Sequence, residues 1–442
     1  MILRLIAENF ASFKDAVEFD TFPSSKSHNH DNHKIDCGHT SALRMSAIYG
    51  ANGAGKSNLV YALGTIRQFV RGGSINGFNH ISSKFKFDPA YSEKPTGLAV
   101  EFYTKGNVFY YHIELSLQEV IFEELLLSLK TKDVELFSRK GNKITLNRKI
   151  SATKTNRAFV DGLSRLVRPD MLVLPFLGNY YPMEFPIITD AYSWFMDMLV
   201  LVQPSASSGV LPQLMDIDKD FSILVNETMP ELKTGIDRLE VKKDVLDESD
   251  ENLDPSILSA IQNAKGQPGV PQIVVEKNSN DILNVVFDSL TMQVIVKRIV
   301  AIHSQNGVDV EMPLRFESDG TRRLIEYMPL FYSVIQKGGV YVVDEIERSI
   351  HPILIKSIIS KISASSSAKG QLIFTTHESC LLDQNIFRPD EIWFAQKDSE
   401  QATQLYPLSD FNIHHTANIE NGYLNGRYGG IPFLSNLKDL HW

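Results

Sequence analysis

The chain has little cysteine and no long apolar run. Cys37 and Cys380 are its only cysteines among 442 residues, too few for the disulfide framework of a small secreted protein. Arg4 and Glu8 interrupt the opening segment too early for a signal peptide, and no later window offers the roughly 18 apolar residues of a membrane helix. We therefore expect a protein of the cytoplasm.

The chain also lacks an excess of positive charge. Lysine and arginine number 44 against 53 aspartates and glutamates, which gives a formal net charge of −9. A surface that is basic all over, as in many nucleic-acid-binding proteins, is thereby excluded, whereas a local basic patch is not. Apolar residues make up 43% and charged residues 22%, the balance of an ordinary globular protein. At this length we expect about two to three domains.

A glycine loop that ends in lysine and serine stands between two apolar segments. Residues 50–57 are GANGAGKS, which matches the pattern GxxxxGKS. The run 47–49 precedes it and apolar residues at helical spacing follow, so the pattern predicts strand, loop and helix. Glycines let successive backbone N–H groups turn inward, toward a phosphate at the helix N-terminus. The residues expected to bind the nucleotide are Gly50, Ala51, Asn52, Gly53, Ala54, Gly55, Lys56, Ser57 and Asn58.

Two side chains of this loop have specific expected tasks. Lys56 would reach the outer phosphates, and the Ser57 hydroxyl would hold Mg²⁺. A plain glycine turn is the alternative interpretation. Average composition produces this pattern by accident on the order of one time in a hundred in a chain of this length, so the nucleotide site is favoured.

A second apolar run ends in two carboxylates. Residues 340–343 are VYVV, followed by Asp344 and Glu345. Such a run is typical of a buried parallel strand, and ligands collect at the carboxyl ends of these strands. Asp344 is therefore expected to orient Mg²⁺, and Glu345 to polarise the attacking water. The alternative, an acidic strand end without chemistry, is disfavoured by the glycine loop upstream.

A third apolar run, in GQLIFTTHES (370–379), is predicted to be a strand that ends near His377. An imidazole at a strand tip can donate a hydrogen bond to the outermost phosphate from one ring nitrogen. A histidine satisfied within its own loop is the alternative. Its position after the Asp-Glu strand favours the phosphate contact.

The segment SDGT precedes a further apolar pattern of helical spacing. Ser318, Asp319, Gly320 and Thr321 are predicted to form the cap and first turn of a helix. A helix start that displays hydroxyl and N–H groups is also an anion-binding surface. One nucleotide cannot occupy two separate helix starts of the same chain. We therefore expect this second helix start to contact the phosphate held by a neighbouring subunit.

These elements, in this order, resemble the ATPase heads of the ABC class, in particular its SMC-like and overcoming-lysogenization-defect branch. The resemblance identifies 50–57 as Walker A, ESDGTRRL (317–324) as the signature, 340–345 as Walker B, ERSIHP (347–352) as the D-loop and His377 as the switch histidine. ENFASFKD (8–15) and GYLNGRYGGIPFL (422–434) also resemble prokaryotic abortive-infection ATPases of this branch, with the ATPase subunits of PARIS anti-phage systems the most similar.

The resemblance implies an α/β fold, an ABC-type ATPase head with a P-loop, a mixed β-sheet with flanking helices, an antiparallel β subdomain and a mainly helical insertion. ATP and Mg²⁺ would be the cofactors. We expect an N-terminal ATPase lobe over 1–180, the insertion with linkers over 181–270 and a C-terminal ATPase lobe over 271–442.

Three features depart from related families. Asp319 and Thr321 replace the usual residues of transporter signatures, which disfavours a transporter head. About 260 residues separate Ser57 from Ser318, yet they lack the sustained heptads of a long coiled-coil arm. The glutamine loop of the class has only a weak candidate, Gln118.

Other segments have simpler predictions. Residues 2–10 and 17–19 are expected to form a β-hairpin, and the segment 96–117 to form two strands around a turn at Lys105, Gly106 and Asn107. The tract 23–40 contains His28, His30, His33, Cys37 and His39. A metal-binding loop is one interpretation, but the spacing fits no established zinc pattern, so a polar, mobile surface loop is favoured. The run FSRKGNKITLNRKISATKTNR (137–157) could face nucleic-acid phosphates, although a solvated hairpin is favoured. Its basic residues are Arg139, Lys140, Lys143, Arg148, Lys149, Lys154 and Arg157.

Two functions fit these features. The first is an ATP-driven scaffold of anti-phage defence, a homo-oligomer (a dimer of heads or a higher ring) with composite nucleotide sites. It would hold a separate effector, expected to be a Toprim nuclease toxin, until a phage-encoded trigger protein arrives. Residues 378–442 are too few for a nuclease domain of ordinary size. The alternative is an SMC-like DNA-maintenance or repair ATPase that acts directly on DNA. A transporter head, which needs a membrane partner, ranks last.

Overall fold

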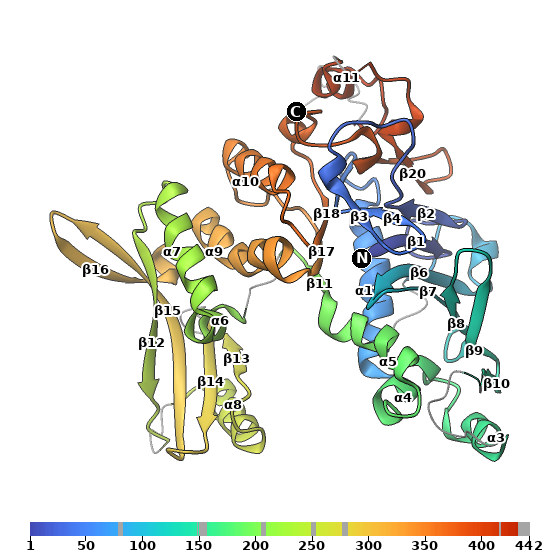
Figure 1. Ribbon diagram of the computed structural model, residues 1–442, viewed down its shortest axis with the longest axis horizontal. Coiled ribbons are helices and arrows are strands. Elements are labelled where there is room, and N and C mark those ends of the chain that lie inside the picture. The colour runs from blue at the N-terminus through green and yellow to red at the C-terminus, as the bar shows by residue number, and fades with distance from the viewer. Residues whose placement is uncertain are drawn as a thin grey trace, which may run out of the picture. The chain divides into compact units, whose positions relative to one another are not determined.

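The structure is a computed structural model, described here for residues 1–77, 83–147, 149, 157–204, 209–248, 253–275, 282–414 and 417–431. The chain divides into two compact units. Unit 1 comprises 1–204, 338–346 and the residues from 359 onward, and unit 2 comprises 205–337 and 347–358. Each unit is built around its own sheets (Figure 1).

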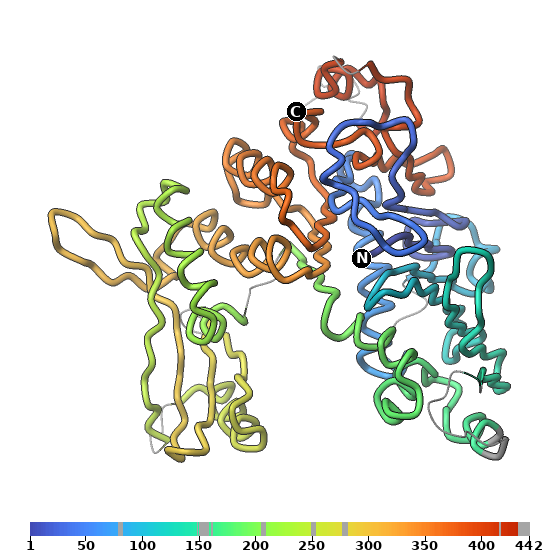
Figure 2. Tube along the Cα trace, viewed as in Figure 1, coloured from blue at the N-terminus to red at the C-terminus, as the bar shows by residue number. Residues whose placement is uncertain are grey.

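The central sheet of unit 1 has six strands in the order β11-β17-β18-β5-β19-β20. All neighbours are parallel except β19 and β20. Strands from opposite ends of the sequence therefore lie side by side, as the blue and orange-red tubes in Figure 2 show. Their bounds are β11 (Leu199–Val202), β17 (Val340–Val343), β18 (Gln371–Thr375), β5 (Met45–Tyr49), β19 (Ile392–Lys397) and β20 (Thr403–Pro407).

A seven-stranded antiparallel sheet forms the second layer of unit 1. Its order is β10-β9-β8-β7-β6-β1-β2. The bounds are β10 (Lys143–Leu146), β9 (Asp133–Lys140), β8 (Val120–Ser128), β7 (Asn107–Leu115), β6 (Thr96–Thr104), β1 (Ile2–Glu8) and β2 (Val17–Asp20). The predicted hairpin at the N-terminus and the predicted strands on either side of residues 105–106 are both confirmed.

Helix α1 (Lys56–Gly72) packs into the core that both sheets share. Ile66 and Phe69 lie in one buried cluster with Phe102 of the antiparallel sheet and Ile373 of the parallel sheet. Burying one such side chain stabilises the fold by about 1.5–3 kcal/mol, so α1 and its first turn are firmly anchored. The other elements of unit 1 are β3 (Lys34–Asp36), β4 (Ser41–Leu43), α3 (Arg157–Leu166), α4 (Val173–Tyr180), α5 (Pro186–Ser193) and α11 (Ile419–Leu424). Helix α10 (Pro352–Ala364) has residues in both units.

Unit 2 is built on an antiparallel sheet in the order β12-β15-β14-β13, and β16 pairs with the end of β15. The bounds are β12 (Arg238–Val245), β15 (Gln293–Gln305), β14 (Ile282–Asp288), β13 (Gln272–Val275) and β16 (Val308–Pro313). Its helices are α6 (Leu211–Ile217), α7 (Lys219–Glu231), α8 (Pro255–Gly266) and α9 (Asp319–Tyr332). Helix α8 buries Ile257 and Ile261 against Val285 of the sheet.

The α/β class is confirmed, with a mainly parallel sheet beside an antiparallel one. Between 181 and 270 most described elements are helices, as expected. That segment does not fold by itself, because β12 pairs with β15 and β11 pairs with β17. The chain passes between the compact units at 204/205, 337/338, 346/347 and 358/359. The boundaries expected from the sequence were 180/181 and 270/271.

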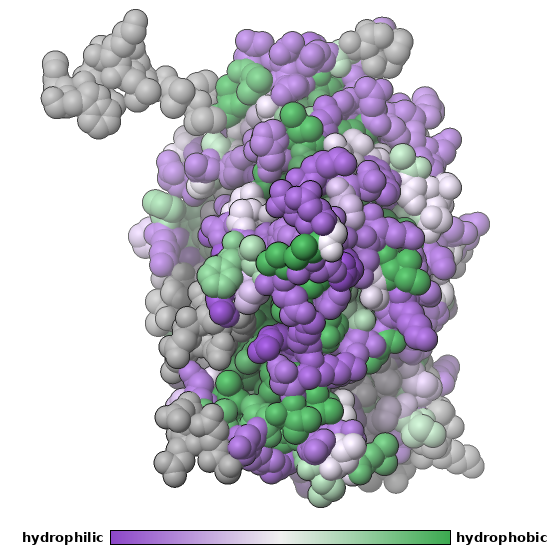
Figure 3. Space-filling model, turned by 90° about the vertical axis from the view of Figure 1, so that its left-hand side faces the viewer, coloured by the Kyte–Doolittle hydropathy of each residue, from purple (hydrophilic) through white to green (hydrophobic). Residues whose placement is uncertain are grey.

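Figure 3 shows one face of the molecule coloured by hydropathy. On the face drawn in Figure 3, hydrophilic residues predominate and the hydrophobic ones interrupt them. Within the described ranges, no helix combines the length and the apolar composition that a membrane span requires.

Candidate nucleotide site

The glycine loop connects the end of β5 to the first turn of α1. Gly53 and Gly55 have φ angles of 77° and 104°, a region that residues with a Cβ rarely enter. A Cβ on Gly50 would lie 2.5 Å from the carbonyl oxygen of Ala395. Glycine is therefore required at these positions. The loop leads directly into a helix N-terminus, whose backbone N–H groups can hold an anion.

Lys56 opens α1 and is only 5% exposed. Its Nζ donates to the carbonyl oxygens of Gly50 at 2.7 Å and Ala51 at 3.2 Å. It also lies 3.4 Å from Nδ1 of His377. An ammonium can only donate, so Nδ1 is the acceptor in this contact. The structure thus brings the predicted switch histidine beside the lysine that is expected to reach the outer phosphates.

Two residues from distant parts of the chain brace the loop from outside. The buried Thr403 hydroxyl donates to the carbonyl oxygen of Ala54 at 2.8 Å and lies 2.7 Å from the Ser12 hydroxyl. Asn58 donates to the same Ser12 hydroxyl at 2.7 Å. A Cβ on Gly55 would collide with the Thr403 side chain. This Ser12–Thr403 brace holds one loop carbonyl outward, which is what an inward-facing ring of N–H groups requires.

The two carboxylates follow β17 at the same sheet edge as the glycine loop. Parallel pairing aligns Val343 with Phe374, so Asp344 and Thr375 are the next neighbours. The Thr375 hydroxyl donates to Oδ1 of Asp344 at 2.6 Å. The backbone N–H of Glu345 donates to that hydroxyl at 2.8 Å, and Glu345 has a φ of 52°. Three of the predicted residue groups therefore converge at the ends of β5, β17 and β18.

Ser57 and Asp344 fit a bound magnesium ion by their chemistry. Ser57 Oγ lies 3.0 Å from Oδ1 of Asp344. Hydroxyl and carboxylate oxygens are the hard ligands that Mg²⁺ takes, and phosphates and water usually complete its shell. The described residues contain no group of three or more histidine, cysteine or acidic side chains that could hold a metal alone. The site thus suits a cation that arrives with a nucleotide.

The predicted SDGT cap belongs to unit 2. The Ser318 side chain accepts a hydrogen bond from the Thr321 N–H at 3.1 Å, as an N-cap does. Asp319 pairs with Arg322 one turn later. A Cβ on Gly320 would lie 2.5 Å from the carbonyl oxygen of Ser349, in the predicted D-loop. The helix start therefore requires a glycine where that loop crosses it.

The weak glutamine-loop candidate, Gln118, is wrong. It lines a pocket with Asn76 and Gly77, just beyond the C-terminal end of α1. Lys56 lies at the other end of this 17-residue helix, about 25 Å away at roughly 1.5 Å per residue.

Gln203 was not among the predicted site residues, although it follows a strand that pairs with β17. It follows the apolar run LVLV of β11, whose last carbonyl, on Val202, accepts from the Asp344 N–H at 2.9 Å. The signal was an apolar run that ends in a polar residue, as in the Asp-Glu strand.

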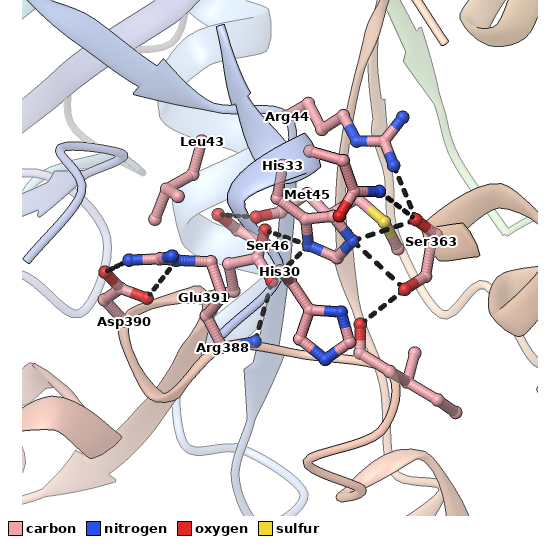
Figure 4. Close-up of polar contacts among 12 residues, drawn as sticks. His30, His33, Leu43, Arg44, Met45, Ser46, Ser363, Arg388, Asp390 and Glu391 are labelled. Atoms are coloured by element: carbon pink, nitrogen blue, oxygen red, sulfur yellow. Dashed lines mark hydrogen bonds and ion pairs between the residues drawn. The ribbon is translucent and has the colours of Figure 1, made fainter. Parts of the chain in front are cut away.

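The prediction of a polar surface loop over 23–40 is wrong for its centre. His33 is fully buried, and Cys37 is 1% exposed. Nδ1 of His33 lies 2.9 Å from both carboxylate oxygens of Glu391, and Nε2 lies 3.0 Å from the Ser363 carbonyl oxygen (Figure 4). Both ring nitrogens are therefore engaged in hydrogen bonds within the protein, which is typical of a structural histidine rather than a metal ligand. Burial raises the pKa of Glu391, and its hydrogen bond to His33 acts in the opposite direction.

The basic run is only partly a solvated hairpin. Strands β9 and β10 form the predicted hairpin, but Arg139 is 1% exposed and donates to the carbonyl oxygens of Gly141 at 2.7 Å and Met171. Lys140 and Lys143 are exposed. Arg148 and Lys154 lie outside the described residues, as does the side chain of Arg157. Arg139 is thus unavailable to nucleic acid and serves the packing of this lobe.

Comparisons with known proteins give the family. Residues 45–383 match the family model described as "AAA domain, putative AbiEii toxin, Type IV TA system". The chain belongs to this AAA-domain family. The match spans the glycine loop, the predicted signature helix, the Asp-Glu strand and the predicted switch histidine, and the family is one of nucleotide-binding ATPases.

Solved structures with a similar fold include head domains of SMC proteins. One, a SmcHead bound to the C-winged helix domain of ScpA, is 14% identical with a TM-score of 0.43, over 92% of this chain and 97% of that chain. The SMC head domain from Thermotoga maritima is 12% identical with a TM-score of 0.37, over 93% and 99%. A Pyrococcus furiosus Smc head bound to the C-terminal domain of ScpA is 13% identical with a TM-score of 0.36, over 92% and 96%. Among curated proteins no match is found.

Proposed function

We propose that this AAA-domain protein binds ATP with Mg²⁺ at the loop 50–58 and hydrolyses it. The observation that carries the proposal is the convergence of Lys56, Ser57, Asp344, Glu345 and His377 at one sheet edge. Magnesium, when bound, would neutralise phosphate charge and orient the outer phosphate.

The residues of the chain then have distinct roles. Lys56 donates to the outer phosphates, and the N–H groups at the start of α1 hold the inner ones. The Glu345 carboxylate accepts a proton from the attacking water as its oxygen bonds to the terminal phosphorus. His377 donates a hydrogen bond to the phosphoryl group as the bond to the leaving diphosphate breaks. Gln203 follows the strand that pairs with β17, and we propose that its amide orients water or the cation.

We further propose that the protein is a homo-oligomer whose nucleotide sites are shared between copies. The support is the start of α9, where Ser318 is the N-cap and Asp319 and Gly320 form the first turn, since a helix N-terminus can hold an anion. A second copy would close over the terminal phosphate with this helix start. A dimer of heads and a higher ring both satisfy this arrangement.

Within the family, we propose a role in anti-phage defence of the PARIS type. The protein would be the ATP-dependent scaffold and sensor that holds a separate toxic effector, a Toprim nuclease, until a phage-encoded trigger binds. The family description names a toxin and a Type IV TA system, which supports this context. The genes beside the one that encodes this chain provide a direct test, since a small Toprim-like nuclease there is expected.

The chemistry is tested with two variants. Lys56→Ala should lose ATP binding, because it removes the charge that faces the phosphates. Glu345→Gln should keep ATP binding and lose turnover, because only water activation is removed. Mass measurement of Glu345→Gln with and without Mg·ATP should show a larger assembly with nucleotide. A normal hydrolysis rate in Glu345→Gln would refute the assigned base, and a monomer under every condition would refute the shared sites.

A further inference from the structure

The hydroxyl of Thr375 contacts both parts of the Asp-Glu segment. It donates to Oδ1 of Asp344 at 2.6 Å and accepts from the Glu345 backbone N–H at 2.8 Å. A hydroxyl has one proton and two lone pairs, so it can make both hydrogen bonds at once. Thr375 is fully buried and Asp344 is 8% exposed. Water therefore has little access to replace either bond.

The backbone of Glu345 needs such support. Its φ of 52° lies in the left-handed region, which is uncommon for residues other than glycine. Residues held there persist when surrounding contacts determine them. The hydrogen bond from the Glu345 N–H to Thr375 is such a contact, made at the residue whose carboxylate is expected to activate water.

Ser57 and Thr375 share one acceptor oxygen of Asp344. Ser57 Oγ lies 3.0 Å from Oδ1 of Asp344, the oxygen that also accepts from Thr375. A carboxylate fixed by a buried donor cannot rotate freely, so its remaining acceptor sites face a defined direction. Outer hydrogen bonds of this kind orient metal ligands and raise metal affinity.

We propose that Thr375 is the positioning residue for both carboxylates of the nucleotide site. It orients Asp344 toward the cation and fixes the backbone turn that presents Glu345 to water. This inference rests on the proposed function and assigns a role to a residue at the end of β18, on a different strand from either carboxylate.

The test replaces Thr375 with valine, which has the same shape without the hydroxyl. Binding of a fluorescent ATP analogue is measured in EDTA and along a Mg²⁺ titration, and kcat is measured at saturating Mg·ATP. For Thr375→Val we expect the Mg²⁺ concentration for half-maximal effect to rise about 10–100-fold and kcat to fall by a similar factor. Binding of the analogue in EDTA should stay within about twofold, because the glycine loop is untouched.

Two control variants separate positioning from packing. Thr375→Ser keeps the hydroxyl and should restore both the Mg²⁺ dependence and kcat to within about threefold of wild type. Thr376→Val removes a neighbouring buried hydroxyl that accepts from the Glu378 N–H at 3.0 Å and contacts neither carboxylate. It should leave the Mg²⁺ dependence unchanged. If Thr375→Val does not fold, as judged by circular dichroism, Thr375→Ala is measured with the same expectations.

The outcomes distinguish this inference from the proposed function. A wild-type protein without Mg²⁺-dependent ATP binding would end both. A wild-type protein that binds and hydrolyses ATP, with Thr375→Val showing the same Mg²⁺ dependence and kcat, would end this inference alone. Equal impairment of Thr375→Ser and Thr375→Val would also overturn it, since the hydroxyl would then not matter.

Discussion

Removing the Thr403 hydroxyl should weaken nucleotide binding from outside the site. Thr403→Val keeps the side-chain shape but deletes the donor to the Ala54 carbonyl oxygen and the contact with Ser12, at 2.8 and 2.7 Å. Thr403 is fully buried, so the carbonyl would have no solvent to replace its partner. A buried polar group left without its hydrogen bond costs about 1–3 kcal/mol.

Part of this cost should appear in ATP affinity. The brace holds the Ala54 carbonyl outward before ATP arrives, so without it the loop must be ordered during binding. If about 1.4 kcal/mol of this cost makes the free energy of ATP binding less favourable, ATP affinity falls about tenfold. Isothermal titration with ATP gives the affinity, and urea unfolding gives the free energy of unfolding. Thr403→Ser, which keeps the hydroxyl, should behave nearly as wild type in both.

A double variant tests whether the brace acts as one unit. Ser12 contacts both Thr403 and Asn58, so the effects of Ser12→Ala and Thr403→Val should be less than additive. If Thr403→Val lowers the free energy of unfolding but binds ATP with wild-type affinity, the brace is structural only and the reasoning is refuted.

Three further predictions concern groups away from the phosphates. In urea unfolding, Arg139→Leu should lower the free energy of unfolding by about 3 kcal/mol or more, because carbonyl oxygens that accept from Arg139 lose their hydrogen-bond donor. Lys140 is exposed, so Lys140→Leu should change the free energy of unfolding by less than about 0.5 kcal/mol. At pH 8, iodoacetamide should modify the half-buried Cys380 well before Cys37. Burial raises the Cys37 pKa to about 11, and the reactive thiolate forms only as the pH approaches that value. Equal labelling of the two cysteines, measured by mass spectrometry, would contradict this prediction. Duplex DNA should bind weakly and without stimulating hydrolysis, and tight, salt-dependent binding in a fluorescence titration would instead favour the DNA-maintenance alternative.

The sequence predicts the parts of the fold that local patterns determine. The apolar runs before Gly50, Asp344 and His377 are all strands of one sheet, because short runs bounded by glycine and polar residues are typical of parallel strands. The Ser318 cap could also be predicted, since capping depends on residues three positions apart. Each of these features is determined by residues that are close together in the sequence.

Contacts between residues far apart in the sequence could not be predicted from local patterns. The tract around His33 is rich in polar residues and therefore predicts a surface loop, whereas His33 is buried against Glu391, 358 positions away. Thr403 and Ser12 are 391 positions apart, and no local pattern connects them to the glycine loop. The apolar run before Gln203 predicts a strand, but only the pairing of β11 with β17 brings the end of that strand beside Asp344.

Mixing two inactive variants tests the shared nucleotide site most directly. Lys56→Ala disables the glycine loop of its own copy, and Ser318→Arg disables the helix start that should complete the site of the neighbouring copy. In an equal mixture of dimers, half are mixed and each retains one intact site of two, so about a quarter of wild-type ATPase activity should return. If the mixture stays as inactive as the separate variants while mixed assemblies are seen by native mass spectrometry, the shared site is contradicted.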